Sequence, residues 1–138
     1  MSDFQFQPAS FIPFRDTEVI ARVRAIKRED IPRHPNPDFR ITVMSGEEMT
    51  FRWLWDMFHR IVTARDAGRT CVLITPQPWP AGYSRLAFML NTFRVDCKHL
   101  HTFNMDEYAN EDGHIAPETW RYGLSYSMKT SFYRDLDP

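Results

Sequence analysis

Two adjacent carboxylates in the hexapeptide Phe103-Asn-Met-Asp-Glu-Tyr108 are the side chains of this sequence best suited to acid–base chemistry. Asp106 and Glu107 are accompanied by an amide and a phenol, and the hexapeptide closely follows a short apolar segment. A carboxylate at the rim of a sheet can abstract a proton from a bound substrate. The alternative is a structural role, in which Asn104 and Asp106 only hydrogen-bond the backbone of a turn.

The carboxylates lie at the rim of a sheet only if a strand ends just before them. Residues 99–103 are predicted to be that strand. Residues 70–75 are predicted to be a second, buried parallel strand, because they form a short apolar run with β-branched residues. Apolar and polar residues alternate over 39–44, which predicts a further strand.

Helices are predicted between and after these strands from capping residues and apolar spacing. Ser45 and Glu48 have the spacing of a capping box, and Ala67-Gly68 is typical of a helix end. A second helix is predicted from Ala81 to about Phe93, and a last helix from Pro117, which suits a first helical turn. The apolar residues expected on the inner faces are Leu54, Met57, Phe58, Ile61 and Val62, then Leu86, Met89, Leu90 and Phe93, then Trp120, Leu124, Met128 and Phe132.

The order of these elements predicts the fold class. Strand and helix alternate as βαβαβ, followed by a polar loop over 104–116 and a helix. This order is typical of a Rossmann-like, doubly wound α/β fold, in which helices flank a mostly parallel sheet. Ligands usually bind at the carboxyl ends of such strands. The predicted site therefore includes the loops that follow Thr75 and Phe103.

Composition limits the classes of function and partner. The 138 residues carry 17 basic and 18 acidic side chains, a net charge of −1, which argues against a nucleic-acid partner. No apolar run approaches the ~20 residues that cross a bilayer, and no signal-peptide pattern opens the chain, so no membrane partner is expected. Two cysteines without a metal-binding pattern favour a cytoplasmic protein with free thiols and no metal.

The first 38 residues differ from the rest of the chain. Half of the ten prolines fall within 1–38, and the proline-rich segment 31–38 suits neither a helix nor a central strand. We expect 1–38 to be an N-terminal arm and linker with one short helix over 17–28, packed on its own domain or on a partner subunit. Residues 39–138 are expected to form the α/β domain.

The sequence of residues 99–108, His-Leu-His-Thr-Phe-Asn-Met-Asp-Glu-Tyr, resembles the strand and active-site loop of glucosamine-6-phosphate deaminases, also called isomerases. Pro117-Glu-Thr-Trp and the residues after it are similar to the opening of the family's next helix. Residues 39–74 are similar to its first strand, long helix and second strand. The resemblance covers 39–138 and only the N-terminal half of the family domain, so the fold is expected to be truncated.

The resemblance implies a reaction and a role for each residue of the site. Asp106 would be the base that moves a proton between C1 and C2 of an open-chain amino-sugar phosphate. The products would be fructose 6-phosphate and ammonia, formed without a metal or redox cofactor. The remaining residues expected near this sugar phosphate are Asn104, Glu107, Tyr108, Thr75, Gln77, Trp79 and His114. A homo-oligomer is also expected, because a truncated sheet exposes an edge and a face.

A second function stays open because the chain departs from the family pattern. The family's glycine-rich phosphate loop is replaced by Thr75-Pro-Gln-Pro-Trp-Pro80, whose three prolines donate no hydrogen bonds. Asp112-Gly-His-Ile-Ala116 is similar to the family's ring-opening motif, but it lies too close to Asp106 to be that motif. The alternative is a non-catalytic domain that binds sugar phosphates or mediates assembly. Two roles stay open for Trp79, stacking on a sugar face and packing in the core.

Overall fold

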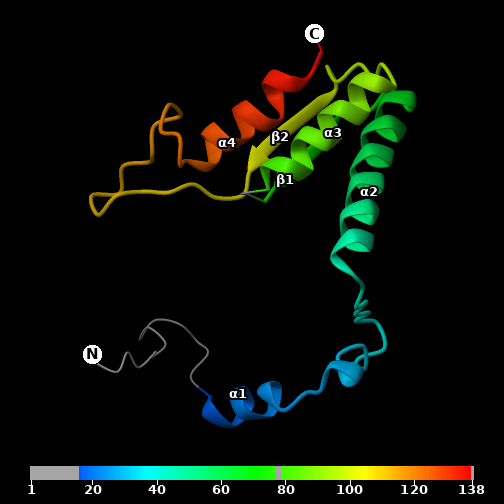
Figure 1. The fold of residues 1–138 in the computed structure, drawn as a ribbon, viewed down its shortest axis with the longest axis vertical. Helices are drawn as coiled ribbons and strands as arrows, with labels where there is room; N and C mark the ends of the chain where they lie inside the picture. Colours follow the sequence, from blue (N-terminus) through cyan, green and yellow to red (C-terminus); the bar gives the residue numbers. More distant parts are fainter. Residues whose placement is uncertain (1–15, 77–78, 138) are drawn as a thin grey trace. The chain divides into compact units, whose positions relative to one another are not determined.

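The computed structural model describes residues 16–76 and 79–137. The chain divides into two compact units, Met1–Met44 and Ser45–Pro138, whereas the sequence placed the boundary after residue 38. Figure 1 labels the α-helices and the strands of the two units. The first contains α1 (Thr17–Arg24) and the short 3-10 helix η1 (Arg28–Asp30); the second contains α2 (Gly46–Asp66), β1 (Cys71–Thr75), α3 (Pro80–Thr92), β2 (Leu100–Asn104), α4 (Leu124–Ser131) and η2 (Tyr133–Asp135).

The first unit has little internal packing in its described part. Its helix α1 begins where the Asp16 carboxylate accepts hydrogen bonds from the amides of Glu18 and Val19, at 3.1 and 3.0 Å. No described residue of this unit is buried. The strand predicted over 39–44 is wrong, because this segment is irregular and has no ladder partner. Alternation alone does not make a strand, since each strand needs a neighbour for its backbone groups.

Helix α2 begins and ends where the sequence predicted. The Ser45 hydroxyl accepts a hydrogen bond from the Glu48 amide at 3.1 Å. The Glu48 carboxylate pairs with Arg52 one turn later, at 2.7 Å, so only half of the predicted capping box forms. At the other end Gly68 has a φ of 62°, and the amide of Arg69 returns to the carbonyl of Ala64. This is a Schellman ending, which favours glycine at that position.

The sheet consists of two parallel strands joined by α3. Cys71 pairs with Leu100 and Thr75 with Asn104 at the two ends of the register. The strands predicted over 70–75 and 99–103 are therefore confirmed, and the fold is a mixed α/β fold. The prediction that 70–75 is buried holds for one face only: Cys71 and Thr75 are buried, but Val72 and Ile74 are 59% and 68% exposed.

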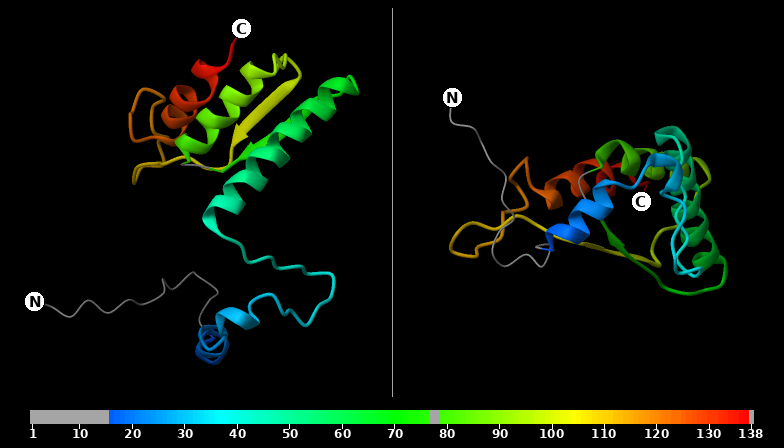
Figure 2. Two further views of the ribbon diagram at one scale, coloured as in Figure 1. Left: turned by 45° about the vertical axis from the view of Figure 1, so that its right-hand side comes forward. Right: turned by 90° about the horizontal axis from the view of Figure 1, so that it is seen from below.

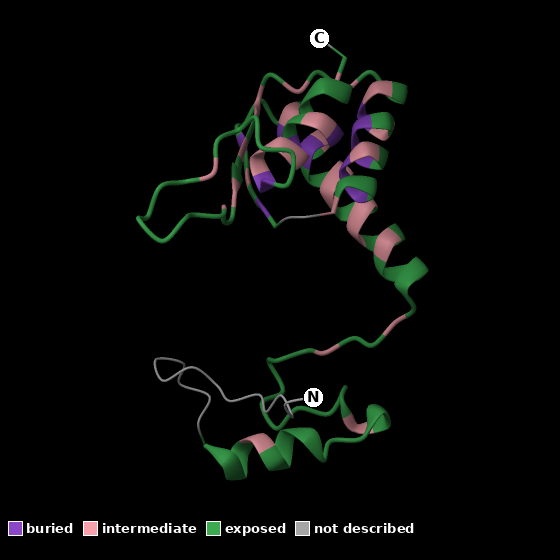
Figure 3. Cartoon of the chain, turned by 60° about the vertical axis from the view of Figure 1, so that its left-hand side comes forward, coloured by how far each residue is buried: buried purple, intermediate pink, exposed green. Residues whose placement is uncertain are grey.

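The core lies between the inner face of the sheet and the three long helices of the second unit. Figure 3 shows the buried residues gathered where α2, α3 and α4 face one another and the strands. The central side chains are Ile61, Tyr83, Leu86, Leu90, Met128 and Phe132. All except Tyr83 come from the predicted helix faces. The prediction fails for Phe93, which is 64% exposed although its ring lies 5.3 Å from that of Phe58.

The last helix begins later than predicted. Residues 117–123 form successive turns, in which the amide of Trp120 bonds to Pro117 and the amide of Gly123 bonds to Trp120. Helix α4 starts only at Leu124, so Pro117 is not in its first turn and Trp120 is outside it. The helix begins at Leu124 because the amide of this residue is capped there by the carboxylate of Glu107, a residue from a distant part of the chain.

We expect Gly82→Ala to destabilise the second unit by about 1–3 kcal/mol, because the new methyl group overpacks the core. A Cβ at Gly82 would meet the Trp79 indole at 2.6 Å, whereas a Cβ at Gly46 would meet nothing within 4 Å. Gly46→Ala is therefore the matched control and should be neutral or stabilising. Urea unfolding measures both. An equally stable Gly82→Ala variant would contradict the packing of Trp79.

Candidate functional site

The carboxyl end of the sheet brings the two predicted ligand loops together. Thr75 and Asn104 are partners at the last position of the register. Thr75 is buried, and its hydroxyl donates to the carbonyl of Phe103 at 3.2 Å. The Tyr83 hydroxyl donates to the carbonyl of Pro76 at 2.9 Å and holds the start of the first loop. Thr75 therefore fixes the strand ends from inside and is not placed to contact a ligand.

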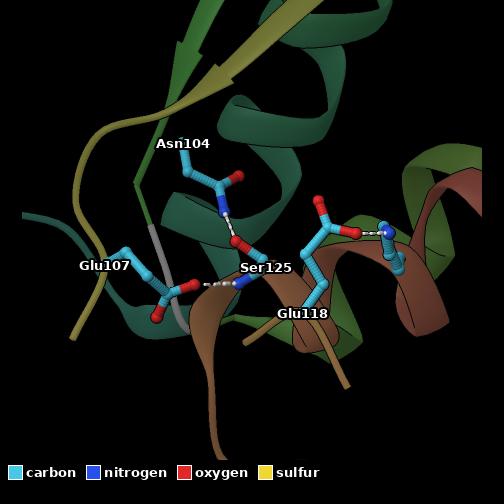
Figure 4. Close-up of polar contacts among 5 residues, drawn as sticks. Asn104, Glu107, Glu118 and Ser125 are labelled. Atoms are coloured by element: carbon cyan, nitrogen blue, oxygen red, sulfur yellow. Dashed lines mark hydrogen bonds and ion pairs between the residues drawn. The ribbon is translucent and has the colours of Figure 1, made fainter. Parts of the chain in front are cut away.

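Glu107 is the most strongly hydrogen-bonded side chain of the hexapeptide. Its Oε1 accepts from the amides of Leu124 and Tyr108 at 3.0 and 2.9 Å, and its Oε2 accepts from the amide of Ser125 at 2.7 Å. The Asn104 amide group donates to the Ser125 hydroxyl at 3.4 Å (Figure 4). These contacts tie the hexapeptide to the first turn of α4, whose own N-cap residue, Gly123, provides no side-chain cap.

The hydrogen bonds of Glu107 set its charge. Burial by itself would raise the pKa of this carboxyl group, but hydrogen bonds from Ser125 and from the amides of Leu124 and Tyr108 outweigh it. The pKa of Glu107 is lowered from 4.5 to about 2. The side chain is thus a carboxylate that neutralises the positive end of α4. This role differs from the expectation of a residue that faces the sugar phosphate.

Asp106 has the opposite environment. Its side chain is exposed, and no hydrogen bond or ion pair joins it to another residue in the described part of the chain. Its neighbours Asn104 and Glu107 are both fixed on α4, so the backbone on either side of Asp106 is held. The arrangement presents one carboxylate, open to solvent, on an anchored turn. Such a group can accept a proton from a bound molecule.

Two of the predicted contact residues, Trp79 and His114, do not join this group. Trp79 is half-buried and packs on Trp53, with ring centroids 4.7 Å apart, so it serves the core. His114 is exposed in the hairpin closed by the bridge between Ala109 and Ile115, within the loop that extends from β2 and α4 in both views of Figure 2. Gln77 lies outside the described residues.

A row of exposed aromatic rings begins in the hexapeptide. Its first ring, Tyr108, was predicted as part of the site, whereas Trp120 and Tyr122 were not. The ring of Tyr108 is 5.9 Å from that of Trp120, which is 5.7 Å from that of Tyr122. Trp120 was expected on a helix face, and Ser125 was not among the expected site residues. A signal was present in the Trp-Arg-Tyr run before Gly123, because large aromatic residues in a polar loop have no core to fill.

The histidines and cysteines of the described residues do not build a second reactive site. His99 uses its Nε2 in a hydrogen bond of 2.9 Å with the carbonyl oxygen of Ile61, whereas His101 is exposed. Burial raises the pKa of both cysteine thiols, which disfavours the reactive thiolate at neutral pH. No group of three potential metal ligands occurs among the residues that the structure describes.

Comparisons of the chain with protein-family models, with curated proteins and with solved structures found no match. Among residues 16–76 and 79–137, no helix has both the length and the apolar character needed to cross a membrane.

Replacing Glu107 with glutamine is expected to destabilise the second unit by about 1–2 kcal/mol at neutral pH, because the cap loses its charge and one acceptor oxygen. The folded-state pKa is the lower one, so the contribution is complete above about pH 4.5 and is lost as the pH falls towards 2. Urea unfolding of wild type and variant across this range measures the difference.

Glu111→Gln is the control for this prediction, because Glu111 is exposed on the same loop. It should leave the free energy of unfolding unchanged throughout the range. A Glu107→Gln variant as stable as wild type at neutral pH would contradict the capping role.

Proposed function

We propose that this chain is a proton-transfer domain of the glucosamine-6-phosphate deaminase/isomerase type, with Asp106 as the base. The observation that carries the proposal is the exposed Asp106 carboxylate, held between two anchored residues at the carboxyl end of a parallel strand. The hexapeptide that resembles the family's active-site loop is the segment that Asn104 and Glu107 fix in place.

The chemistry requires only a proton acceptor and water. In an open-chain amino-sugar phosphate, Asp106 would take the proton from C2 and return it to C1, while the C1 oxygen gains a proton through water and the amino group loses one. This leaves an imine at C2, which water hydrolyses to a ketone with release of ammonia. No oxidant or reductant is consumed, because the aldehyde at C1 is reduced as C2 is oxidised. A general base of this kind contributes roughly 10²–10⁴-fold to a rate.

The architecture supports the same proposal. Two parallel strands joined by a helix form the repeating unit of a doubly wound sheet, and ligands of such sheets bind beyond the carboxyl ends of the strands. We propose that β1 and β2 belong to a sheet of this kind. The N-terminus of α4 is already neutralised by Glu107, so the phosphate of a substrate would bind elsewhere.

Asp106→Asn should lower hydrogen exchange at C2 of glucosamine 6-phosphate, and ammonia release, by about 100-fold or more, because the amide cannot act as the base. Exchange is followed by NMR in deuterated water, and ammonia by a coupled assay. Since Asp106 has no partner among the described residues, its replacement should leave the unfolding midpoint unchanged.

The matched control is Asp112→Asn, because Asp112 is an exposed carboxylate of the same loop. It should keep the activity of the wild type. Full activity of the Asp106 variant, or a wild-type chain that neither exchanges hydrogen nor releases ammonia, would overturn the proposal.

A second candidate function is assembly, and the outer face of the sheet favours it. Val72 and Ile74 of β1 and Phe103 of β2 are 59%, 68% and 61% exposed, and Ile74 and Phe103 are partners in the register. The described helices of this unit pack on the other face. Contiguous apolar side chains of this kind often mark a protein interface. We propose that this face binds a second copy of the chain.

Ile74→Asp should weaken self-association by about tenfold or more, because burying an isoleucine contributes ~1.5–3 kcal/mol and each 1.4 kcal/mol is a factor of ten. Sedimentation velocity over a range of concentrations measures the change. Phe88→Asp is the matched control, since Phe88 is equally exposed, at 71%, but lies on α3. A wild-type chain that stays monomeric would contradict the assembly role.

A further inference from the structure

Tyr108 and Trp120 form an aromatic corner beside Asp106. Their ring planes are nearly perpendicular, at 83°, and their centroids are 5.9 Å apart. Tyr108 is 52% and Trp120 42% exposed, so both rings keep open surface. In the sequence Tyr108 stands two residues after Asp106. One ring of the aromatic corner therefore belongs to the same hexapeptide as the proposed base.

The aromatic corner is anchored by the Glu107 network. The Tyr108 amide donates to Glu107 at 2.9 Å, which fixes the backbone below the first ring. The indole of Trp120 lies against Gly123, where an added Cβ would stand 3.6 Å from both the indole Cε3 and the Glu107 Oε1. The edge-to-face contact of the two rings stabilises their relative orientation further. The rings are thus held before any ligand arrives.

The loop that carries the aromatic corner has a negative net charge. The loop from 104 to 123 carries five carboxylates but only one arginine. Glu107 is neutralised by amides and Glu118 pairs with Lys129, whereas Asp106, Glu111 and Asp112 are exposed and have no ion-pair partner within the described residues. The guanidinium of Arg121 lies 4.8 Å from the ring centre of Tyr122 and covers that ring instead.

We propose that the aromatic corner of Tyr108 and Trp120 binds the ammonium group of the substrate. This inference rests on the proposed function and names the part of the site that distinguishes an amino sugar from its hydroxyl analogue. A cation over the face of a tryptophan or tyrosine is attracted by the negative face of the ring, by ~0.5–2 kcal/mol. A neutral hydroxyl group in the same position gains no such attraction. The exposed Asp106 carboxylate, two residues before Tyr108, favours the same sign of charge.

Two unreactive probes that differ only in this group test the proposal. They are 2-amino-2-deoxyglucitol 6-phosphate and glucitol 6-phosphate, which lack the carbonyl group and cannot be isomerised. Calorimetric titration of the full chain should show that the amino alditol binds roughly 3- to 30-fold more tightly. Trp120→Leu and Tyr108→Leu should each reduce this preference, whereas Trp120→Phe should keep most of it because a ring face remains.

Tyr122→Leu is the matched control, because Tyr122 is an exposed neighbouring ring already covered by Arg121. It should keep the preference for the amino alditol. A wild-type chain that binds both probes equally or neither, or a Trp120→Leu variant that keeps the full preference, would overturn the proposal.

The experiments distinguish a failure of the aromatic corner from a failure of the proposed function. Hydrogen exchange that depends on Asp106, combined with no preference between the probes, would overturn only the role of the aromatic corner. Amine-selective binding that depends on Trp120, without turnover of glucosamine 6-phosphate, would support the aromatic corner and overturn only the catalytic role of Asp106.

Discussion

The Glu107 carboxylate joins the hexapeptide to the start of α4, 17 and 18 residues further along the chain. Helix α4 has no side-chain cap of its own, so its first amides depend on this distant residue. The same helix carries Met128 into the core, and Phe132 follows at its end. The position of the proposed base is thereby coupled to the packing of the whole second unit. Loss of the cap would affect the site and the core together.

The described helices of the second unit cover only one face of its sheet, and this arrangement determines which surfaces of the sheet stay exposed to a ligand or a partner. The connection through α3 crosses one face of the parallel pair, and α2 and α4 pack beside α3. Polar groups at the carboxyl ends of the strands then meet at one edge, where Thr75 and Asn104 are partners. The opposite face keeps Val72, Ile74 and Phe103 exposed. The proposed catalytic surface and the proposed assembly surface can therefore coexist, because they use different sides of the same two strands.

The sequence predicted those features of the fold that depend on short-range patterns, such as the helix caps and the apolar helix faces. Ser45, Gly68 and the apolar spacing of α2 and α3 determine local structure, and the structure agrees with them. It could not predict that 39–44 lacks a strand partner, because pairing depends on a distant neighbour. The start of α4 was missed for the same reason. The hexapeptide was correctly placed at a strand end, but its composition could not show which carboxylate is used as the cap and which is exposed.

Glu107 caps α4, whereas Asp106 is exposed. This difference between the two carboxylates also determines which end of a ligand the hexapeptide favours. A free helix N-terminus attracts anions, but Glu107 has already supplied that negative charge to α4. The charge that remains on the turn is that of Asp106, and the adjacent rings attract cations rather than anions. A phosphate group at the same place would be repelled. We infer that a ligand with both groups binds with its ammonium group at the aromatic corner and its phosphate directed away from the turn.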